Sequence, residues 1–385
     1  MVEKNSQPET RRKFLAGAAG AAGASLAGCL GGDDDDGGDD GGDMDDGGEV
    51  TGESDDGMPD FVNVATWGGA YGQGSEEHFL DPWGEENGVD VNRSDFGNDF
   101  DLIGRQQAGG DALDLIMPGY VALYSGIQDD LVDTFDLDDI EGADRIVDTF
   151  HPDNVPYDPG EEAHHIPFVF GGDGLTYNTE EMDRPDSWWD IYTDENDGRI
   201  AQPGFIDRTV GVAAAHAEIE VGDIGENTDE KMEEVWDVVE DIEPFVFNWF
   251  DEAQTMSNLL GDGSAVAGQL WIGRAFPLRE EDGVPVEYTV PEEGASGWTD
   301  VWAIPVESEK KEASKSILEY TLRDEPSAAF AQDIPYGPGQ ELDDPPAVLE
   351  ENEDIIHNDR LSPWDVEVLN ENQEEWQREF QELIR

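Results

Sequence analysis

The chain has 385 residues, with 20 basic and 94 acidic side chains, so its formal net charge at pH 7 is −74. This length is enough for two globular lobes, and the acidic balance excludes nucleic acid and anionic lipid as partners of the folded part. Because the acids occur throughout the chain, we expect a halophilic protein that works in molar salt, where the Debye length is about 3 Å. The single cysteine excludes an internal disulfide.

The N-terminal segment has the pattern of an export signal. Arg11 and Arg12 precede a short apolar run that cannot span a bilayer as a permanent helix, and the run ends at Leu26-Ala27-Gly28-Cys29. The arginines resemble a twin-arginine signal, and the last four residues resemble a lipobox. We therefore expect residues 1–29 to be a signal and Cys29 to be lipidated, which holds the protein at the extracellular face of the cell membrane. Residues 30–59, mostly Asp and Gly, are expected to form a disordered tether.

The folded part begins with strands that alternate with helices. Strands are predicted over 61–66, 89–92 and 113–118, and helices over 75–84 and 98–108. This alternation predicts a mainly parallel α/β lobe. A glycine-rich turn after the first strand places Trp67 and Tyr71 at its carboxyl end, where ligands bind in open α/β sheets. The turn lacks the Lys-Ser/Thr pair of a phosphate-binding loop.

A second set of elements starts with a β-rich segment over 166–179. Adjacent residues of a strand point to opposite sides, so His164 and His165 before it are expected to be exposed polar side chains rather than a metal pair. The strand predicted over 265–270 delivers Trp271 at its carboxyl end. Further strands are predicted over 198–203 and 245–247, and helices over 228–241, 257–261, 308–322, 327–331 and 367–384.

The segment 294–305 carries the pattern that most directly indicates a ligand. Trp298 and Asp300 are two residues apart, so on a strand both side chains point to the same side. An aromatic face beside a carboxylate suits an ammonium group. For the other aromatic side chains, taken singly, core packing is at least as good an interpretation.

The order of these segments resembles the extracellular solute-binding proteins of ABC importers, and specifically the spermidine/putrescine-binding family. The resemblance runs through nearly all of residues 61–385, in the family's order. It implies a type II periplasmic-binding-protein fold, α/β with two lobes and a ligand cleft between them. The matching motifs are Thr66-Trp67-Gly-Gly-Ala-Tyr71, Asp114-Leu-Ile-Met-Pro118, Ile166-Pro-Phe, Tyr177-Asn-Thr179, Ser187-Trp-Trp-Asp190, Gly198-Arg-Ile-Ala, Gly297-Trp298-Thr-Asp300-Val-Trp-Ala-Ile-Pro305 and Ile334-Pro-Tyr336.

The resemblance also implies a ligand site in which rings clamp an aliphatic chain and carboxylates take up its ammonium ends. Two departures bear on the solute. Val210 stands where polyamine binders carry a second-lobe Glu, and Arg274 follows Trp271 closely, where the family has small polar residues. Gly119 occupies a hydroxyl position, with Tyr120 beside it. The ligand-binding residues expected from the motifs and departures are Trp67, Tyr71, Tyr120, Asp207, Trp271, Arg274, Trp298, Asp300 and Tyr336.

We expect the first lobe to comprise residues 60–168 and 298–342, and the second lobe residues 169–297 and 343–385. The leading hypothesis is a monomeric, lipid-anchored receptor that delivers spermidine or putrescine to the permease of an ABC importer. One alternative is a zwitterionic or carboxylate-bearing solute held partly by Arg208 or Arg274, because a guanidinium opposes a diamine and suits a carboxylate. A thiamine-like cation is another.

A secreted hydrolase and an adhesive surface protein are alternatives from other classes. The chain has no Gly-x-Ser-x-Gly motif, no His-Glu-x-x-His motif and no convincing catalytic triad. Paired acids carry no information against so acidic a background. We therefore expect no enzymatic activity, no catalytic residue, no metal and no cofactor.

Overall fold

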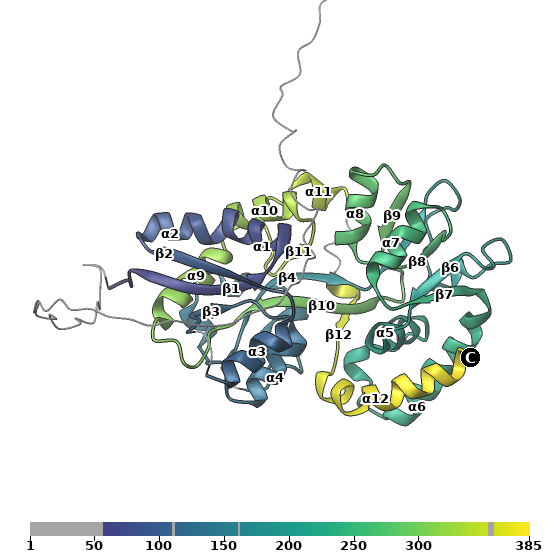
Figure 1. The fold of residues 1–385 in the computed structure, drawn as a ribbon, viewed down its shortest axis with the longest axis horizontal. Helices are drawn as coiled ribbons and strands as arrows, with labels where there is room; N and C mark the ends of the chain where they lie inside the picture. Colours follow the sequence, from purple (N-terminus) through teal and green to yellow (C-terminus); the bar gives the residue numbers. More distant parts are fainter. Residues whose placement is uncertain (1–56, 110–111, 161, 353–357) are drawn as a thin grey trace, which may run out of the picture. The chain divides into compact units, whose positions relative to one another are not determined.

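The computed structural model describes residues 57–109, 112–160, 162–352 and 358–385. The expected signal, Cys29 and nearly all of the expected tether lie outside these residues. The described residues form three sheets with helices packed around them (Figure 1). No described helix is long and apolar enough to cross a membrane.

The first lobe contains a three-stranded sheet, and a four-stranded sheet adjoins it. Strands β1 (Phe61–Trp67), β2 (Asp90–Phe96) and β3 (Leu115–Ile116) pair in parallel in the order β2-β1-β3. The second sheet has the order β11-β4-β10-β12. Its strands are β4 (Ile166–Gly172), β10 (Ala295–Trp302), β11 (Gly337–Pro338) and β12 (Leu361–Pro363).

Strand β10 joins these two sheets. It runs antiparallel to β4, and just beyond its end Ala303 and Ile116 exchange backbone hydrogen bonds of 3.0 and 2.9 Å. The N–H of Val301 also donates to the carbonyl of Pro118 at 3.0 Å. The segment that carries Trp298 and Asp300 therefore lies beside the carboxyl end of β3.

The second lobe is built on a five-stranded sheet in the order β7-β6-β8-β5-β9. Strand β6 pairs in parallel with β7 and β8, while β5 runs antiparallel to β8 and β9. The strands are β5 (Leu175–Asn178), β6 (Ile200–Pro203), β7 (Val246–Phe250), β8 (Ala267–Gln269) and β9 (Val286–Thr289). Strands β4 and β5 are separated only by Asp173 and Gly174, so the chain passes there from one lobe to the other.

The helices follow the predicted amphipathic segments. Asn98 caps α3 by accepting the N–H of Asp101 at 3.0 Å, and Gly88, with φ of 67°, ends α2. A π-helical turn over Glu76–Leu80 joins α1 to α2. The helices are α1 (Gly69–Ser75), α2 (Asp81–Asn87), α3 (Asp99–Gln107), α4 (Tyr120–Gln128), α5 (Ile206–His216), α6 (Thr228–Ile242), α7 (Ala253–Gly261), α8 (Ile272–Glu280), α9 (Lys311–Thr321), α10 (Asp324–Asp333), α11 (Ala347–Glu350) and α12 (Val366–Leu383). The predicted strands and helices are confirmed, with bounds shifted by a few residues.

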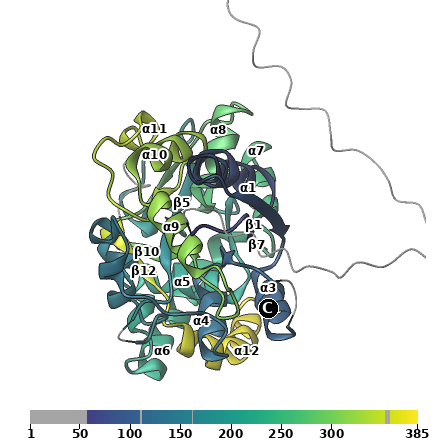
Figure 2. The same cartoon turned by 90° about the vertical axis from the view of Figure 1, so that its left-hand side faces the viewer.

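Helices α1 and α10 are far apart in the sequence and lie side by side (Figures 1 and 2). The ring of Tyr71 in α1 packs edge-on against Phe330 of α10, with centroids 5.7 Å apart, and against Phe168 of β4 at 6.1 Å. These rings belong to the core of the first lobe or pack against it. They fix the direction in which Tyr71 presents its hydroxyl group.

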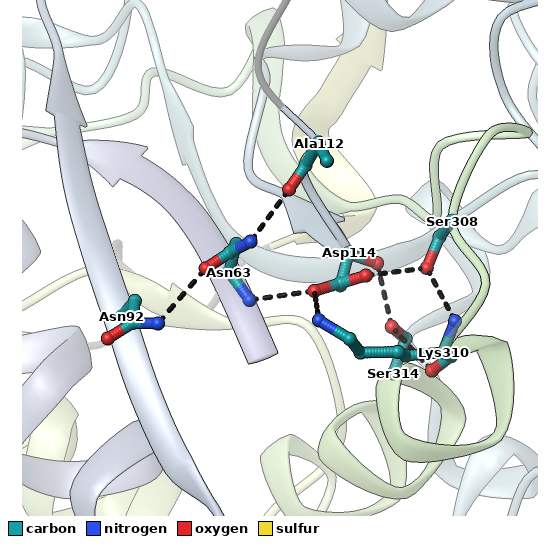
Figure 3. A network of polar contacts seen from close by, with 7 residues as sticks. All are labelled: Asn63, Asn92, Ala112, Asp114, Ser308, Lys310 and Ser314. Carbon is teal, nitrogen blue, oxygen red and sulfur yellow. Dashed lines mark hydrogen bonds and ion pairs between the residues drawn. The ribbon is translucent and has the colours of Figure 1, made fainter. Parts of the chain in front are cut away.

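A buried network ties β1, β3 and the start of α9 together near the amino end of β1 (Figure 3). Asp114 is only 4% exposed. Its carboxylate accepts hydrogen bonds from the N–H of Asn63 (2.8 Å), the hydroxyl of Ser308 (3.0 Å) and the ammonium of Lys310 (3.0 Å). Burying a carboxylate is costly unless it is paired in this way. Asp114 is therefore a structural acid.

The expectation for the two adjacent histidines was wrong. His165 is fully buried, and the side chain of His164 is 13% exposed. The reason is the buried Asp158, whose carboxylate oxygens lie 2.7 Å from Nδ1 of His165 and 2.5 Å from Nδ1 of His164. Burial raises the pKa of Asp158, but the hydrogen bonds from the two histidines outweigh it and hold the pKa below its ordinary value.

Candidate functional site

Trp298 and Asp300 lie on one face of β10, as their spacing predicts. Both are half-buried, while Gly297, Thr299 and Val301 between and beside them are buried. Asp300 lies opposite Gly119, which follows β3 and precedes α4. The face of β10 that carries the Trp-x-Asp pair therefore looks toward the carboxyl ends of β1, β2 and β3.

The carboxylate of Asp300 is partly withdrawn from water, and the described residues supply no positive partner for it. The hydroxyl of Tyr71 donates to its Oδ2 at 2.9 Å, and no lysine, arginine or histidine of the described segments pairs with it. Burial raises the pKa of Asp300 to about 7, although Tyr71 and the nearby indole N–H of Trp67 favour the charged form. The negative charge of Asp99 adds to the increase in pKa.

Asp99 is a second carboxylate at this place, and the sequence analysis missed it. It stands in the first turn of α3, where its Oδ2 accepts the N–H of Gly119 at 3.1 Å. A Cβ atom added to Gly119 would lie 3.0 Å from Oδ2 of Asp99 and 3.6 Å from Oδ1 of Asp300. The missing side chain thus leaves a space bordered by both carboxylates. Burial also raises the pKa of Asp99.

Aromatic rings flank the two carboxylates. Trp298 and Tyr336 meet at 87° with centroids 4.9 Å apart, and Tyr336 meets Tyr71 at 6.2 Å. Burial, followed by the charge of Asp300, raises the pKa of Tyr336 to about 12 and that of Tyr71 well above its usual value. Both phenols therefore stay neutral, and each retains a hydroxyl proton that it can donate.

A separate cluster belongs to the second lobe. Trp271 follows β8, and its indole N–H donates to Oδ1 of Asp173 at 2.6 Å. Arg208 places Nη1 3.1 Å from Oδ2 of the same carboxylate and 3.5 Å from Oδ2 of Asp207. Its Cζ lies 5.7 Å from the centroid of the Trp271 ring. We call Asp173, Asp207, Arg208 and Trp271 the arginine cluster.

The remaining predicted residues lie beside one cluster or the other. Tyr120 begins α4; burial raises its pKa, and the charges of Arg208 and Asp173 act on its hydroxyl. Arg274 is exposed in the first turn of α8, and its charge lowers the pKa of Tyr336 against the effect of burial. A Cβ atom on the adjacent Gly273 would collide with the Tyr336 hydroxyl. The two lobes therefore meet at this point.

The structure thus divides the predicted set into two groups. Trp67, Tyr71, Trp298, Asp300 and Tyr336 come together with the unpredicted Asp99. Asp207 and Trp271 come together with Arg208 and the unpredicted Asp173. One feature of the sequence could have indicated Asp99 as a site residue. It lies three residues after β2, at the start of α3, and therefore near the carboxyl edge of the parallel sheet. Asp173 carries no such signal, because Gly-Gly-Asp-Gly reads as an ordinary turn.

Other parts of the described chain are weaker candidates for a ligand or metal site. No group of three or more His, Cys, Asp or Glu side chains within these residues is placed to hold a metal ion. A cavity of about 230 Å³ beside Ser296 is lined by Glu220, Glu292, Glu293 and Arg360 among others, and no aromatic side chain lines it. The carboxylates and rings around Asp300 form a combination that suits an organic cation and that holds no basic side chain of the described residues.

Two α/β lobes joined by crossing strands, with such a cluster at the carboxyl ends of the strands, define a type II periplasmic-binding-protein fold. Residues 79–350 match the model of the family described as bacterial extracellular solute-binding protein. The chain belongs to this family, whose members bind small solutes and work with the permeases of ABC transporters.

Named relatives are similar at low identity. The spermidine/putrescine-binding periplasmic protein of Escherichia coli is 24% identical over 265 residues, which are 67% of this chain and 72% of that protein. The putrescine-binding periplasmic protein SpuD of Pseudomonas aeruginosa is 22% identical over 274 residues, 68% of this chain and 74% of the relative. The crystal structure of the spermidine/putrescine ABC transporter substrate-binding protein PotD of Streptococcus pneumoniae matches with a TM-score of 0.72 and 19% identity, covering 84% of this chain and 99% of that one. That likeness shows the fold.

Replacing Asp300 by Asn should stabilise the solute-free protein at pH 8 by roughly 2 to 4 kcal/mol. Because folding raises the pKa of Asp300 to about 7, its ionisation reduces stability progressively between about pH 4 and pH 7, and the loss is complete above pH 7. Asn does not ionise and still accepts the Tyr71 hydrogen bond.

Chemical unfolding at pH 8 in molar salt measures this difference. The exposed Asp90→Asn is the matched control and should change the free energy of unfolding little. An unchanged or lower stability of Asp300→Asn would contradict the assignment of an unpaired, desolvated carboxylate.

Proposed function

We propose that this protein is a monomeric, lipid-anchored receptor of an ABC importer and that its solute carries a primary ammonium group, with spermidine and putrescine as first candidates. The observation that carries the proposal is the unpaired Asp300. An ammonium bound between Asp300 and Asp99 would supply the positive charge that the described residues do not.

The other buried acids make this observation specific. Among the described residues the buried aspartates are Asp114, Asp158 and Asp173, and each has a basic partner within the chain: Lys310, the two histidines and Arg208, respectively. Asp300 and Asp99 are half-buried with raised pKa values and have no such partner among the residues described. A protein that neutralises its structural acids internally leaves these two for an external cation.

The surrounding rings suit the rest of such a solute. Trp298, Tyr336 and Tyr71 offer apolar faces and edges beside the carboxylates, and a cation over such a face gains about 0.5 to 2 kcal/mol. The names of the Escherichia coli and Pseudomonas aeruginosa relatives, which refer to spermidine and putrescine, support the same class of solute. Two carboxylates for one ammonium also favour a primary amine, because it has three donors.

A second candidate solute is an amino-acid-like zwitterion, which Arg274 favours. Arg274 is exposed, its charge reaches Tyr336, and it makes no ion pair with the described residues. A carboxylate on the solute could pair with this guanidinium while the ammonium lies at Asp300. Arg274→Ala distinguishes the two candidates: a zwitterion would bind much more weakly to it, and a polyamine equally or better.

Isothermal titration calorimetry in molar salt, with putrescine, spermidine and a panel of amino acids, tests the proposal. We expect a polyamine to bind at pH 8 and to bind roughly tenfold more weakly at pH 6, because a carboxyl with a pKa of about 7 is mostly protonated there while the amine stays charged. Asp300→Asn should abolish this pH dependence together with most of the affinity. Failure of every polyamine to bind at pH 8 would rule out the proposed solute class.

Lipid anchoring through Cys29 is proposed from the sequence, since that residue lies outside the described part. Leu26-Ala27-Gly28-Cys29 after the paired arginines supports it, and the acidic segment that follows would act as a tether. Mass spectrometry of the exported protein should find Cys29 as a lipidated N-terminus. An intact signal with an unmodified cysteine would exclude the anchor.

A further inference from the structure

Arg208 occupies a place that resembles a binding site for a cation. Its guanidinium lies between the carboxylates of Asp173 and Asp207, at 3.1 and 3.5 Å, and near the ring of Trp271, at 5.7 Å. A tryptophan face with adjacent carboxylates is what an organic ammonium group requires. Asp207 and Trp271 are also the residues expected to receive the second-lobe end of a polyamine. The positive charge already present there belongs to the protein.

We propose that Arg208 is a built-in cation that fills the second-lobe cation site, so that the receptor engages one ammonium group of its solute, at Asp300 and Asp99, and not a second. This inference rests on the proposed function, and it narrows the solute class. The recognised feature is a single primary ammonium on a short chain, and further amino groups bring little affinity.

Asp173 is the positioning residue that keeps Arg208 in place. It is 1% exposed and stands at the crossing between β4 and β5. Besides Arg208, its carboxylate accepts hydrogen bonds from the indole N–H of Trp271 and from the hydroxyl of Ser296 in β10. Removing the guanidinium would leave a buried charge without a counter-ion, which is strongly unfavourable.

The neighbouring carboxylates also keep the guanidinium of Arg208 positively charged despite its burial. Burial acts against a guanidinium charge, but Asp173 and Asp207 outweigh it and raise the pKa of Arg208. The side chain is 17% exposed, so it borders the solvent-accessible site rather than lying in the core. Its fixed positive charge therefore repels any second ammonium that approaches Asp207.

The neighbouring positions of α5 offer no second carboxylate that could bind an ammonium group in place of Asp207. Val210 stands one helical turn into α5, where a polyamine binder would carry Glu, and it is fully buried. Thr209 before it is also buried, and its hydroxyl donates to the carbonyl of Pro203 at 2.7 Å. A second ammonium would therefore have to share Asp207 with Arg208.

A series of amines tests this inference by calorimetry at pH 8 in molar salt. The probes are n-butylamine, putrescine and spermidine, which have one, two and three amino groups. In the wild-type protein we expect putrescine to bind less than tenfold more tightly than n-butylamine. In the double variant Arg208→Gln/Asp173→Asn the cation site is vacated without leaving an unpaired buried charge. The preference for putrescine over n-butylamine should rise at least tenfold there, with a further gain for spermidine.

The controls separate the possible results. Arg378→Gln removes the same charge from an exposed position on α12 and should leave the preference unchanged. A wild-type preference for putrescine of tenfold or more, or a folded double variant with the wild-type preference, would overturn the inference and leave the proposed function standing. Failure of the wild-type protein to bind any of the three amines would overturn both. The wild-type comparison decides the matter even if the double variant does not fold.

Discussion

A carboxylate that is taken out of water needs a positive partner, and the described aspartates of this protein differ in whether the chain itself supplies one. Asp114, Asp158 and Asp173 are buried, and each is paired with a basic side chain of the same chain. Asp300 is half-buried; it accepts a hydrogen bond from the hydroxyl of Tyr71, and no basic side chain of the described residues pairs with it. In a chain of net charge −74, surface acids without a basic partner are common. Asp300 differs from them because burial raises its pKa and no basic side chain of the described residues pairs with it.

The topology explains how the groups around Asp300 come together. The parallel strands β1, β2 and β3 end at one edge, and each is followed within a few residues by a residue of the site: Tyr71, Asp99 and Gly119. Strand β10 runs past this edge between β3 and β4, which places Asp300 opposite Gly119. Ligands of open α/β sheets bind at such carboxyl ends. Gly119 matters because its missing side chain leaves room between two carboxylates.

Where the chain crosses between the lobes, a buried carboxylate does receive a positive partner from the chain itself. Asp173 lies where β4 gives way to β5, and its carboxylate binds Ser296 of β10, Trp271 after β8 and Arg208 of α5. One buried acid thus joins the two crossing segments to the second lobe. It also holds Arg208 near the ring of Trp271. In the role that we propose for Arg208, the acid that connects the lobes therefore also limits which solutes the site accepts.

Sequence periodicity predicted most strands and helices, because their patterns are local. It also placed Trp298 and Asp300 on one face, since the alternation of a strand is a local property. Asp99 escaped prediction because 94 acids hide any single functional one, and only its distance from β2 distinguishes it. The histidine expectation failed because His164 and His165 both turn toward Asp158, six and seven residues earlier, and strand alternation says nothing about such a partner.

The pairing of Arg208 with Asp173 spans 35 positions in the sequence and depends on side-chain geometry, so no pattern in the sequence shows it. The most direct test of the account is a carbon-13 NMR titration of the Asp300 carboxyl group, with and without putrescine. The account predicts a pKa of about 7 in the free protein and a decrease of at least two units when putrescine is bound. An ordinary pKa near 4 in the free protein, or a pKa that putrescine does not change, would contradict it.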